Sequence, residues 1–209
     1  MIYPEFDRVG RDLFDHTMNN SHSGNISILQ GGRITITASG SMLHRLRRDD
    51  LVEVGINDLT PSRASRELIV HRAIYRETNA TAIVHAHPPY TVAISEDLEA
   101  IVPVDAEGAY YFGSIPVVSV GNAIGSDEVA GIVPVTLLKM GSPIVVVRNH
   151  GVFSVGRSLN EAFQWISSLE HSSRIIFIRS AYASTWRDIL PPVHRGSRAK
   201  PVMGGNNWG

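Results

Sequence analysis

The sequence lacks cysteine and contains no long apolar run. None of the 209 residues is cysteine, which excludes disulfides, thiolate metal sites and cysteine nucleophiles. A bound metal would therefore need histidine, aspartate or glutamate ligands. No apolar stretch approaches the roughly 20 residues that span a bilayer, and the first residues lack the basic and then apolar layout of a signal peptide. We expect a cytoplasmic protein with no membrane partner.

A strong excess of charge of either sign is also missing. The formal net charge is −1, and the basic cluster at residues 44–48 is interrupted by Leu46 and followed by two aspartates. Such a cluster indicates a solvated, locally compensated surface, so we expect no nucleic-acid partner. With 43% hydrophobic residues, the chain can bury a sizeable core.

Apolar periodicity predicts one domain in which helices and strands are interspersed. Helical patterns cover residues 5–18, 65–77, 90–95, 127–140 and 158–181. Strand patterns cover residues 26–29, 33–37, 51–54, 81–87, 101–104, 115–120, 142–148 and 152–155. Ser65 is the expected N-cap of its helix, with Glu67 in the first turn, and Pro134 should kink or split the helix that contains it.

Several neighbouring strand patterns are joined by hairpin turns, such as the Gln-Gly-Gly turn at residues 30–32. We therefore predict a mixed α/β fold, a single domain with a central, mainly antiparallel sheet flanked by helices. The domain should comprise residues 1–190, and the Gly- and Pro-containing residues 191–209 should form a flexible tail.

Two histidines stand out at the end of a predicted buried strand. His85 and His87 follow the apolar run at residues 82–84 and precede two prolines. Since side chains alternate along a strand, both imidazoles point to the same face. His150 ends a second buried strand, and three neutral imidazoles with an open fourth position form a typical catalytic zinc site. The alternative is that these are unrelated strand-end histidines with ordinary hydrogen bonds.

Other candidates surround this pair in the sequence. Glu67 begins a helix shortly before the His-x-His strand and could reach the same site, although it would also suit the helix dipole. Ser65 and Arg66 lie where free backbone N–H groups can bind an anion. The loops around Gly24 and Gly40 are small enough to approach a phosphate, but each alone is more often a simple turn.

Taken together, these motifs resemble one known family. Ser-Gly-Asn-Ile-Ser, Ile-Thr-Ala-Ser-Gly, Ser-Arg-Glu, His-Ala-His-Pro and Asn-His-Gly occur here in the order typical of the class II aldolase/adducin family. The resemblance covers residues 5–183 and is strongest to the sugar-phosphate aldolases that act on L-fuculose 1-phosphate. It implies a mixed α/β domain and a cyclic homotetramer with active sites between subunits.

The resemblance also implies roles for individual residues. His85, His87 and His150 would hold Zn²⁺ or another divalent metal, and Glu67 would be the catalytic acid/base that also approaches this metal. The substrate phosphate would be bound at Gly24, Asn25, Ser39, Gly40, Ser65 and Arg66.

Two departures from the family pattern affect these roles. The family aldolases usually have two serines before the glutamate, where this chain has Ser65 and Arg66. The arginine side chain could add a charge-assisted phosphate contact, or it could point to solvent while the backbone N–H binds the phosphate. A tyrosine that acts across the subunit interface has no clean counterpart here. The candidates for that role are Tyr110, Tyr111, Asp105 and Glu107.

The implied function is that of a zinc-dependent aldehyde-lyase. It would cleave a ketose 1-phosphate, with L-fuculose 1-phosphate favoured, into dihydroxyacetone phosphate and an aldehyde, L-lactaldehyde. The alternatives are L-ribulose-5-phosphate 4-epimerase, methylthioribulose-1-phosphate dehydratase and a non-catalytic adducin-like module. An epimerase would lack its second acid/base, because that aspartate falls on Ala109. An adducin-like module typically loses metal ligands, which this chain keeps.

Overall fold

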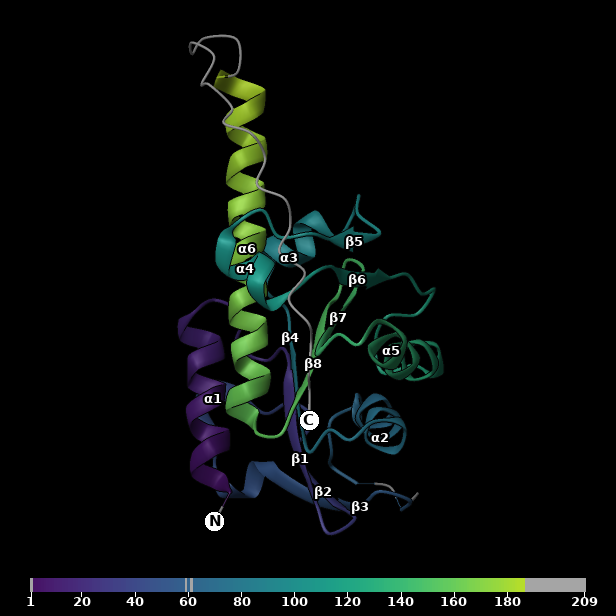
Figure 1. The fold of residues 1–209 in the computed structure, drawn as a ribbon. Coiled ribbons are helices and arrows are strands. Elements are labelled where there is room, and N and C mark those ends of the chain that lie inside the picture. Colours follow the sequence, from purple (N-terminus) through teal and green to yellow (C-terminus); the bar gives the residue numbers. More distant parts are fainter. Residues whose placement is uncertain (1, 59, 61, 187–209) are drawn as a thin grey trace.

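A computed structural model describes residues 2–186 except 59 and 61, and it shows an eight-stranded sheet between two layers of helices (Figure 1). The helices are α1 (Tyr3–Asp15), α2 (Leu68–Glu77), α3 (Pro89–Ile94), α4 (Ala106–Tyr111), α5 (Asp127–Met140) and α6 (Leu159–Trp186). The strands are β1 (Asn25–Gln30), β2 (Arg33–Thr37), β3 (Leu51–Gly55), β4 (Ala82–Ala86), β5 (Ala100–Ile101), β6 (Ile115–Val118), β7 (Ile144–Val147) and β8 (Gly151–Gly156).

The sheet is mainly antiparallel, as the hairpin turns predict. Its strand order is β3-β2-β1-β4-β8-β7-β6-β5, and only the β6–β7 pair is parallel. β4 therefore lies in the middle of the sheet between β1 and β8. This order pairs Asn25 with His85 and brings the ends of β4 and β7 near each other through β8. The mixed α/β fold class predicted from the sequence is confirmed.

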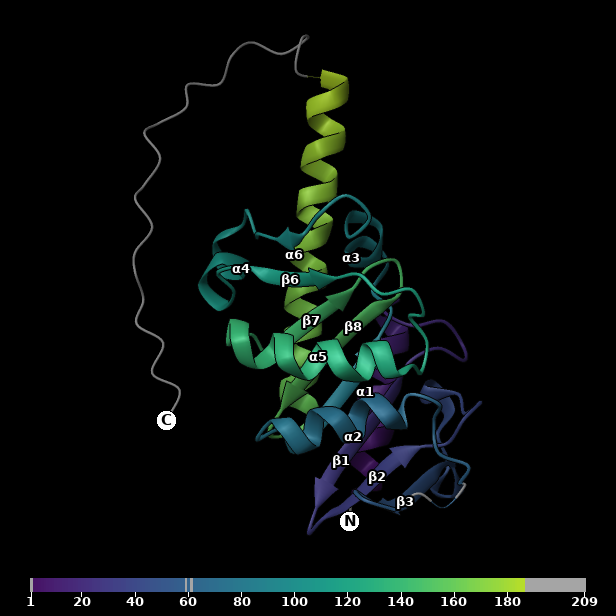
Figure 2. The same ribbon diagram turned by 90° about the vertical axis from the view of Figure 1, so that its right-hand side faces the viewer.

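Each face of the sheet has its own apolar core, because side chains alternate along the strands. Val84 and Val146 point to the layer that contains α1 and α6. Ile83, Val145 and Phe153 point to the layer that contains α2 and α5. Figures 1 and 2 show α2 and α5 side by side on the second face, while α1, α3, α4 and α6 cover the first. The last turns of α6 extend beyond the sheet.

One local expectation is wrong, and one alternative of a second is excluded. Ser65 is not the N-cap of α2, because this helix begins at Leu68 and Glu67 occupies the N-cap position without a side-chain cap. Pro134 does not split its helix: α5 runs unbroken from residue 127 to residue 140. Proline removes only one backbone donor, and α5 keeps its packing on the core through Val133 and Leu137 on either side.

One helix was not anticipated, and the predicted tail is not described. Residues 106–111 form α4, which is capped by the Asp105 carboxylate, whereas the sequence indicated no helix there. The expected flexible tail at residues 191–209 lies outside the described residues. Within residues 2–186, apart from positions 59 and 61, no helix combines the length and apolar character needed to cross a membrane.

Candidate metal centre

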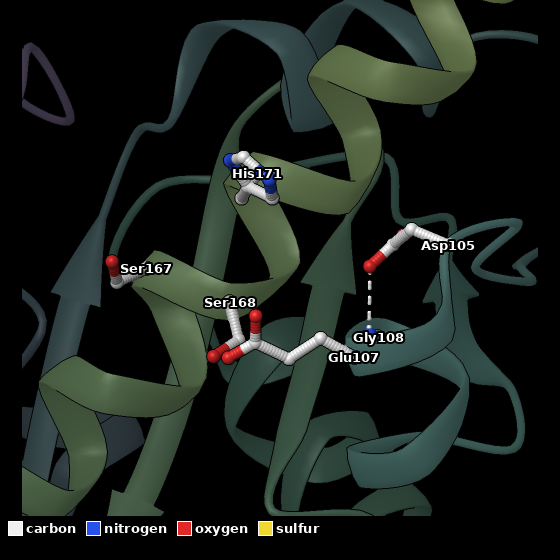
Figure 3. Close-up of a pocket in the computed structure, with 6 residues that line it drawn as sticks. All are labelled: Asp105, Glu107, Gly108, Ser167, Ser168 and His171. Atoms are coloured by element: carbon white, nitrogen blue, oxygen red, sulfur yellow. Dashed lines mark hydrogen bonds between the residues drawn. The ribbon is translucent and has the colours of Figure 1, made fainter.

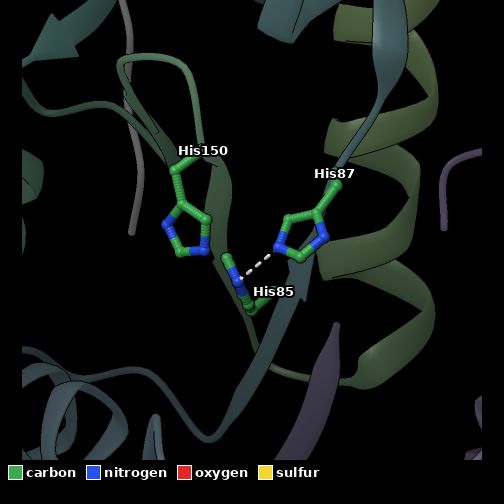
Figure 4. Close-up of side chains that lie close together, drawn as sticks. All are labelled: His85, His87 and His150. Atoms are coloured by element: carbon green, nitrogen blue, oxygen red, sulfur yellow. Dashed lines mark hydrogen bonds between the residues drawn. The ribbon is translucent and has the colours of Figure 1, made fainter. Parts of the chain in front are cut away.

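Three imidazoles meet at one edge of the central strands. His85 is on β4, His87 follows the end of β4, and His150 lies in the turn between β7 and β8 (Figure 4). Their potential ligating atoms all lie within 4.8 Å of one another, and the Nε2 atoms of His85 and His87 are 2.9 Å apart. The sheet order therefore produces the cluster that the strand-end pattern predicted.

Hydrogen bonding presets the tautomer of His85. Its Nδ1 lies 2.9 Å from the carbonyl oxygen of Val152, which can only accept a hydrogen bond. Nδ1–H therefore donates to Val152, and the lone pair of Nε2 faces the other two histidines. Metal-binding histidines usually have such an orienting partner on the second ring nitrogen. Phe153 stacks on the imidazole with ring centroids 4.2 Å apart, which further fixes its orientation.

Burial keeps the three imidazoles neutral. It lowers the pKa of His87 to about 4, with a further contribution from His150. It also lowers the pKa of His150, and it lowers the pKa of His85 well below its ordinary value. A metal ion binds the neutral form of imidazole, so burial leaves these side chains in their ligating form at neutral pH.

Glycines allow the segments around the cluster to come together. A Cβ atom on Gly151 would lie 2.4 Å from the carbonyl oxygen of Ala86 and equally close to the ring of His87. A Cβ atom on Gly24 would lie 2.7 Å from the carbonyl oxygen of His85, and Gly24 has a φ of +77°. Larger residues would push the strand ends apart, so these glycines are needed for close approach to the histidines.

Glu67 is a buried carboxylate beside the three histidines. Its side chain is 4% exposed, and Oε1 accepts a hydrogen bond from the backbone N–H of Gly125 at 2.9 Å. Oε2 is buried without a hydrogen-bond partner among the described residues. Burial raises the pKa of Glu67 to about 6, against the opposing effect of the Gly125 N–H. Such a carboxylate can both accept and donate a proton near neutral pH.

One pocket of about 300 Å³ contains all the residues expected to hold metal and phosphate. Its lining includes His85, His87, His150, Glu67, Gly24, Asn25, Ser39, Gly40, Ser65 and Arg66. Among the described residues, the close cluster of ligating atoms consists of the three histidines. Glu67 lines the same pocket but does not belong to this cluster. Sequence motifs that lie far apart in the chain therefore converge on one cavity.

The small-residue loops of this pocket are tied to each other. Ser39 N–H donates to the carbonyl of Arg63 at 2.8 Å, and Ser65 N–H donates to the carbonyl of Thr37 at 3.0 Å. The Ser65 hydroxyl accepts a hydrogen bond from the N–H of Glu67. These contacts hold the Gly40 loop against the start of α2. The result is a polar wall beside the histidines that is made largely of backbone and small side chains.

The candidates for the interface acid/base lie elsewhere in the chain. Tyr110 is 85% exposed on α4, and Tyr111 packs edge-on to Trp165 of α6. Neither tyrosine lines the histidine pocket. Asp105 and Glu107 line a different cavity of about 210 Å³ between α4 and α6 (Figure 3). There the Asp105 carboxylate accepts a hydrogen bond from Gly108 at 2.7 Å and caps α4.

Two residues at the site carry no recognisable signal in the sequence. Asn19 is 7% exposed, and its side-chain oxygen accepts a hydrogen bond from the N–H of His87 at 3.0 Å. Ile124 is 61% exposed and lines the pocket from the loop before α5. Neither residue belongs to a motif, and only their three-dimensional contacts reveal them. His22, which falls in the loop before Gly24, also lines the pocket.

The donor set fits a transition metal. Two nitrogens bound tetrahedrally to zinc at about 2.0–2.1 Å lie roughly 3.4 Å apart. The 2.9 Å contact and the 4.8 Å limit in the cluster bracket this value, so small side-chain adjustments would suffice. Nδ1 of His150 is buried without a hydrogen-bond partner among the described residues, as is Oε2 of Glu67. Neutral nitrogen donors suit zinc and several other divalent metals.

Comparisons with known proteins agree with this geometry. The sequence profile of the Class II Aldolase and Adducin N-terminal domain matches residues 5–177. An L-fuculose phosphate aldolase from Methanocaldococcus jannaschii is 25% identical over 179 residues, which is 83% of this chain and 94% of that protein. A 3-oxo-tetronate 4-phosphate decarboxylase from Pectobacterium atrosepticum is 29% identical over 189 residues, covering 83% of each chain.

A solved structure shows the same architecture. The crystal structure of L-fuculose-1-phosphate aldolase from Thermus thermophilus superposes with a TM-score of 0.84 and 34% sequence identity. The match covers 92% of this chain and 98% of that chain. The resemblance noted in the sequence motifs thus extends over nearly the whole fold.

Proposed function

Since the chain belongs to the class II aldolase and adducin family, we propose that it is a metal-dependent aldehyde-lyase acting on a ketose 1-phosphate. It cleaves this substrate reversibly to dihydroxyacetone phosphate and an aldehyde. L-Fuculose 1-phosphate, which gives L-lactaldehyde, is the preferred substrate. The observation that carries the proposal is the single pocket in which three neutral imidazoles, a buried carboxylate and small-residue loops meet. The relatives with L-fuculose phosphate aldolase in their names support the choice of substrate.

The three histidines are proposed to hold the metal. His85, His87 and His150 provide nitrogen donors, and Glu67, which lines the same pocket, is proposed to approach the ion as well. A bound zinc ion supplies Lewis acidity, which stabilises the negative charge that develops on the ketone side of the substrate during cleavage. The Val152 carbonyl keeps His85 in the tautomer that binds metal.

The polar wall of the pocket is proposed to bind the substrate phosphate. Gly24 and Gly40 both have a φ of +77° and leave their backbones open to close approach. Asn25, Ser39 and Ser65 add side-chain donors at the same wall, and the exposed Arg66 can add a charge-assisted contact. Holding the phosphate in this way orients the reacting carbons toward the histidines and Glu67.

Glu67 is proposed to move the proton. In the cleavage direction, its protonated carboxyl gives a proton to the carbon of the dihydroxyacetone phosphate fragment. In the condensation direction, its carboxylate removes that proton. A group with a pKa of about 6 can serve in both directions near neutral pH, because both the protonated carboxyl and the carboxylate are populated there.

The functional assembly is proposed to be a homotetramer in which a neighbouring subunit completes the site. Tyr110 is 85% exposed and does not line its own subunit's pocket. Exposed apolar side chains occur in the segment just before α4 and on α6, namely Val102, Val104, Phe177, Ile178 and Tyr182. Burial of these groups between subunits would bring Tyr110 or Tyr111 to a partner's pocket. Sedimentation velocity would reveal a monomer if this assembly were wrong.

A retro-aldol assay on a panel of phosphorylated substrates tests the proposed reaction. The zinc-loaded protein should release dihydroxyacetone phosphate from L-fuculose 1-phosphate faster than from other ketose 1-phosphates, and His87→Ala should abolish this release. His16→Ala, at an exposed position outside the pocket, is a matched control that should retain activity. Release from no ketose 1-phosphate would contradict the proposal.

A second candidate reaction is decarboxylation on the same site. The relative from Pectobacterium atrosepticum is named as a 3-oxo-tetronate 4-phosphate decarboxylase, and it is 29% identical to this chain. Decarboxylation next to a ketone also develops negative charge that a metal can stabilise. Adding a 3-oxo acid phosphate to the panel distinguishes the two reactions, because only decarboxylation releases carbon dioxide.

A further inference from the structure

The loop that joins β6 to α5 makes a specific contact with the proton-carrying carboxylate. Gly125, in this loop, donates its backbone N–H to Oε1 of Glu67 at 2.9 Å. The two residues are 58 positions apart in the chain. The neighbouring Ile124 lines the histidine pocket. The loop at residues 119–126 therefore contacts the site both through a backbone donor and through an apolar side chain.

This loop is braced by its own hydrogen bonds. The N–H of Gly121 donates to Oε2 of Glu128 at 2.7 Å, and the hydroxyl of Ser126 donates to the carbonyl of Asn122 at 2.5 Å. Ser126 also caps α5 by accepting a hydrogen bond from the N–H of Val129 at 3.2 Å. The donor that faces Glu67 is thus attached to the start of a long helix, and α5 packs along α2.

The contact leaves no room for a side chain at residue 125. Gly125 has a φ of +55°, and a Cβ atom there would lie 2.9 Å from the carbonyl oxygen of Arg66. Arg66 directly precedes Glu67, so the loop presses against the backbone that carries the carboxylate. Any larger residue must shift either the loop or the start of α2.

The two carboxylate oxygens have different surroundings. Oε1 accepts the Gly125 hydrogen bond, whereas Oε2 is buried and has no hydrogen-bond partner among the described residues. We propose that Gly125 is a positioning residue whose N–H holds Oε1, so that Oε2 is the oxygen that exchanges the proton with the substrate carbon. In cleavage, the O–H bond at Oε2 breaks and a C–H bond forms; condensation reverses both changes. The inference rests on the proposed function.

A pair of glycine variants separates this role from simple backbone strain. Gly125 lies just before α5 and Gly141 just after it, with φ values of +55° and +57°. An alanine at either position has an unfavourable backbone conformation, but a Cβ atom on Gly141 meets no atom within 4 Å. Gly141→Ala therefore reproduces the strain without displacing the loop from Glu67.

The readout is deuterium incorporation from D₂O into dihydroxyacetone phosphate, measured with zinc-loaded protein. Gly125→Ala should lower the maximal exchange rate about 10²-fold, as a displacement of roughly 1 Å can do, while KM and zinc content stay unchanged. Gly141→Ala should exchange at the wild-type rate. Wild-type exchange by Gly125→Ala would overturn the proposal. A matching rise in KM, or loss of zinc, would assign the loop a structural role and would also overturn it.

An NMR measurement tests the same contact if Gly125→Ala does not fold. The amide signal of Gly125 should move when Glu67→Gln replaces the charged acceptor with a neutral one, whereas the amide signal of Gly121, bound to Glu128, should not. An unmoved Gly125 signal would overturn the proposal. If the wild type exchanges no deuterium at all, the proposed function is wrong. The comparison of the two amide signals then decides by itself whether Gly125 holds Glu67.

Discussion

Burial of Glu67 predicts a pH-dependent loss of stability that Glu67→Gln should remove. The pKa of this carboxyl rises from an ordinary value of 4.5 to about 6 in the folded chain, because burial disfavours the ionised form. Below pH 4.5, both folded and unfolded states are protonated and no penalty exists. Between pH 4.5 and pH 6, the unfolded state ionises while the folded carboxyl stays protonated, so stability falls over this window and stays constant at higher pH.

The size of this loss follows from the two pKa values. At about 1.4 kcal/mol per pKa unit, the full penalty is about 2 kcal/mol at pH 8, and less than half of it is present at pH 5. Glutamine does not ionise. The stability of Glu67→Gln relative to the wild type should therefore increase by about 1 kcal/mol between pH 5 and pH 8. Any constant cost of the new amide cancels in this comparison.

Urea unfolding at both pH values measures the difference. The protein must be metal-free, because a bound cation would favour the carboxylate, and its concentration must be fixed, because subunit association changes apparent stability. Glu77→Gln is a matched control on the same helix, since Glu77 is exposed at the other end of α2 and should show little change. A relative stability of Glu67→Gln that is equal at pH 5 and pH 8, or lower at pH 8, would show that burial does not penalise the ionised carboxylate.

Three further substitutions test other contacts. The buried Ser27 hydroxyl lies 2.6 Å from His71 Nδ1 and 2.7 Å from the Tyr75 hydroxyl. Ser27→Ala leaves both groups without this partner, so the free energy of unfolding in urea should fall by about 1–3 kcal/mol per group. An unchanged unfolding midpoint would contradict this. In Gly24→Ala, the new Cβ atom collides with the Asn19 side chain and the His85 carbonyl, which displaces the proposed phosphate loop. KM for dihydroxyacetone phosphate should therefore rise without loss of zinc. An unchanged KM would contradict this. If the Arg66 guanidinium contacts phosphate, Arg66→Ala should weaken the binding of inorganic phosphate about tenfold in calorimetry. Unchanged binding would mean that only the backbone N–H of residue 66 can contact the phosphate.

Much of the site could be predicted because it depends on local patterns. Alternation along β4 places His85 and His87 on one face, and the end of β7 is recognisable as a buried apolar run before His150. Strands that end at the same edge of a sheet bring their last residues together. The small-residue loops at Gly24 and Gly40 are equally visible, since positive φ at these positions favours glycine.

The remaining features depend on contacts between distant parts of the chain. The start of α2 could not be placed from Ser65, because the helix begins only at Leu68. Glu67 takes the N-cap position, but its carboxylate accepts a hydrogen bond from the distant Gly125 and does not cap the helix. No local signal marks Asn19 as a partner of His87, since this hydrogen bond joins residues 68 positions apart. The continuity of α5 through Pro134 is likewise decided by packing against the sheet and α2.

A metal on the three histidines and a proton carrier at Glu67 should act together on one phosphorylated substrate. The most direct measurement is deuterium incorporation into dihydroxyacetone phosphate, followed by NMR for zinc-loaded wild type, metal-free wild type and zinc-loaded Glu67→Gln. Only the zinc-loaded wild type should exchange, and the variant should retain its zinc. Exchange that persists without metal, or that continues at the wild-type rate in Glu67→Gln, would show that the metal or the carboxylate is not required.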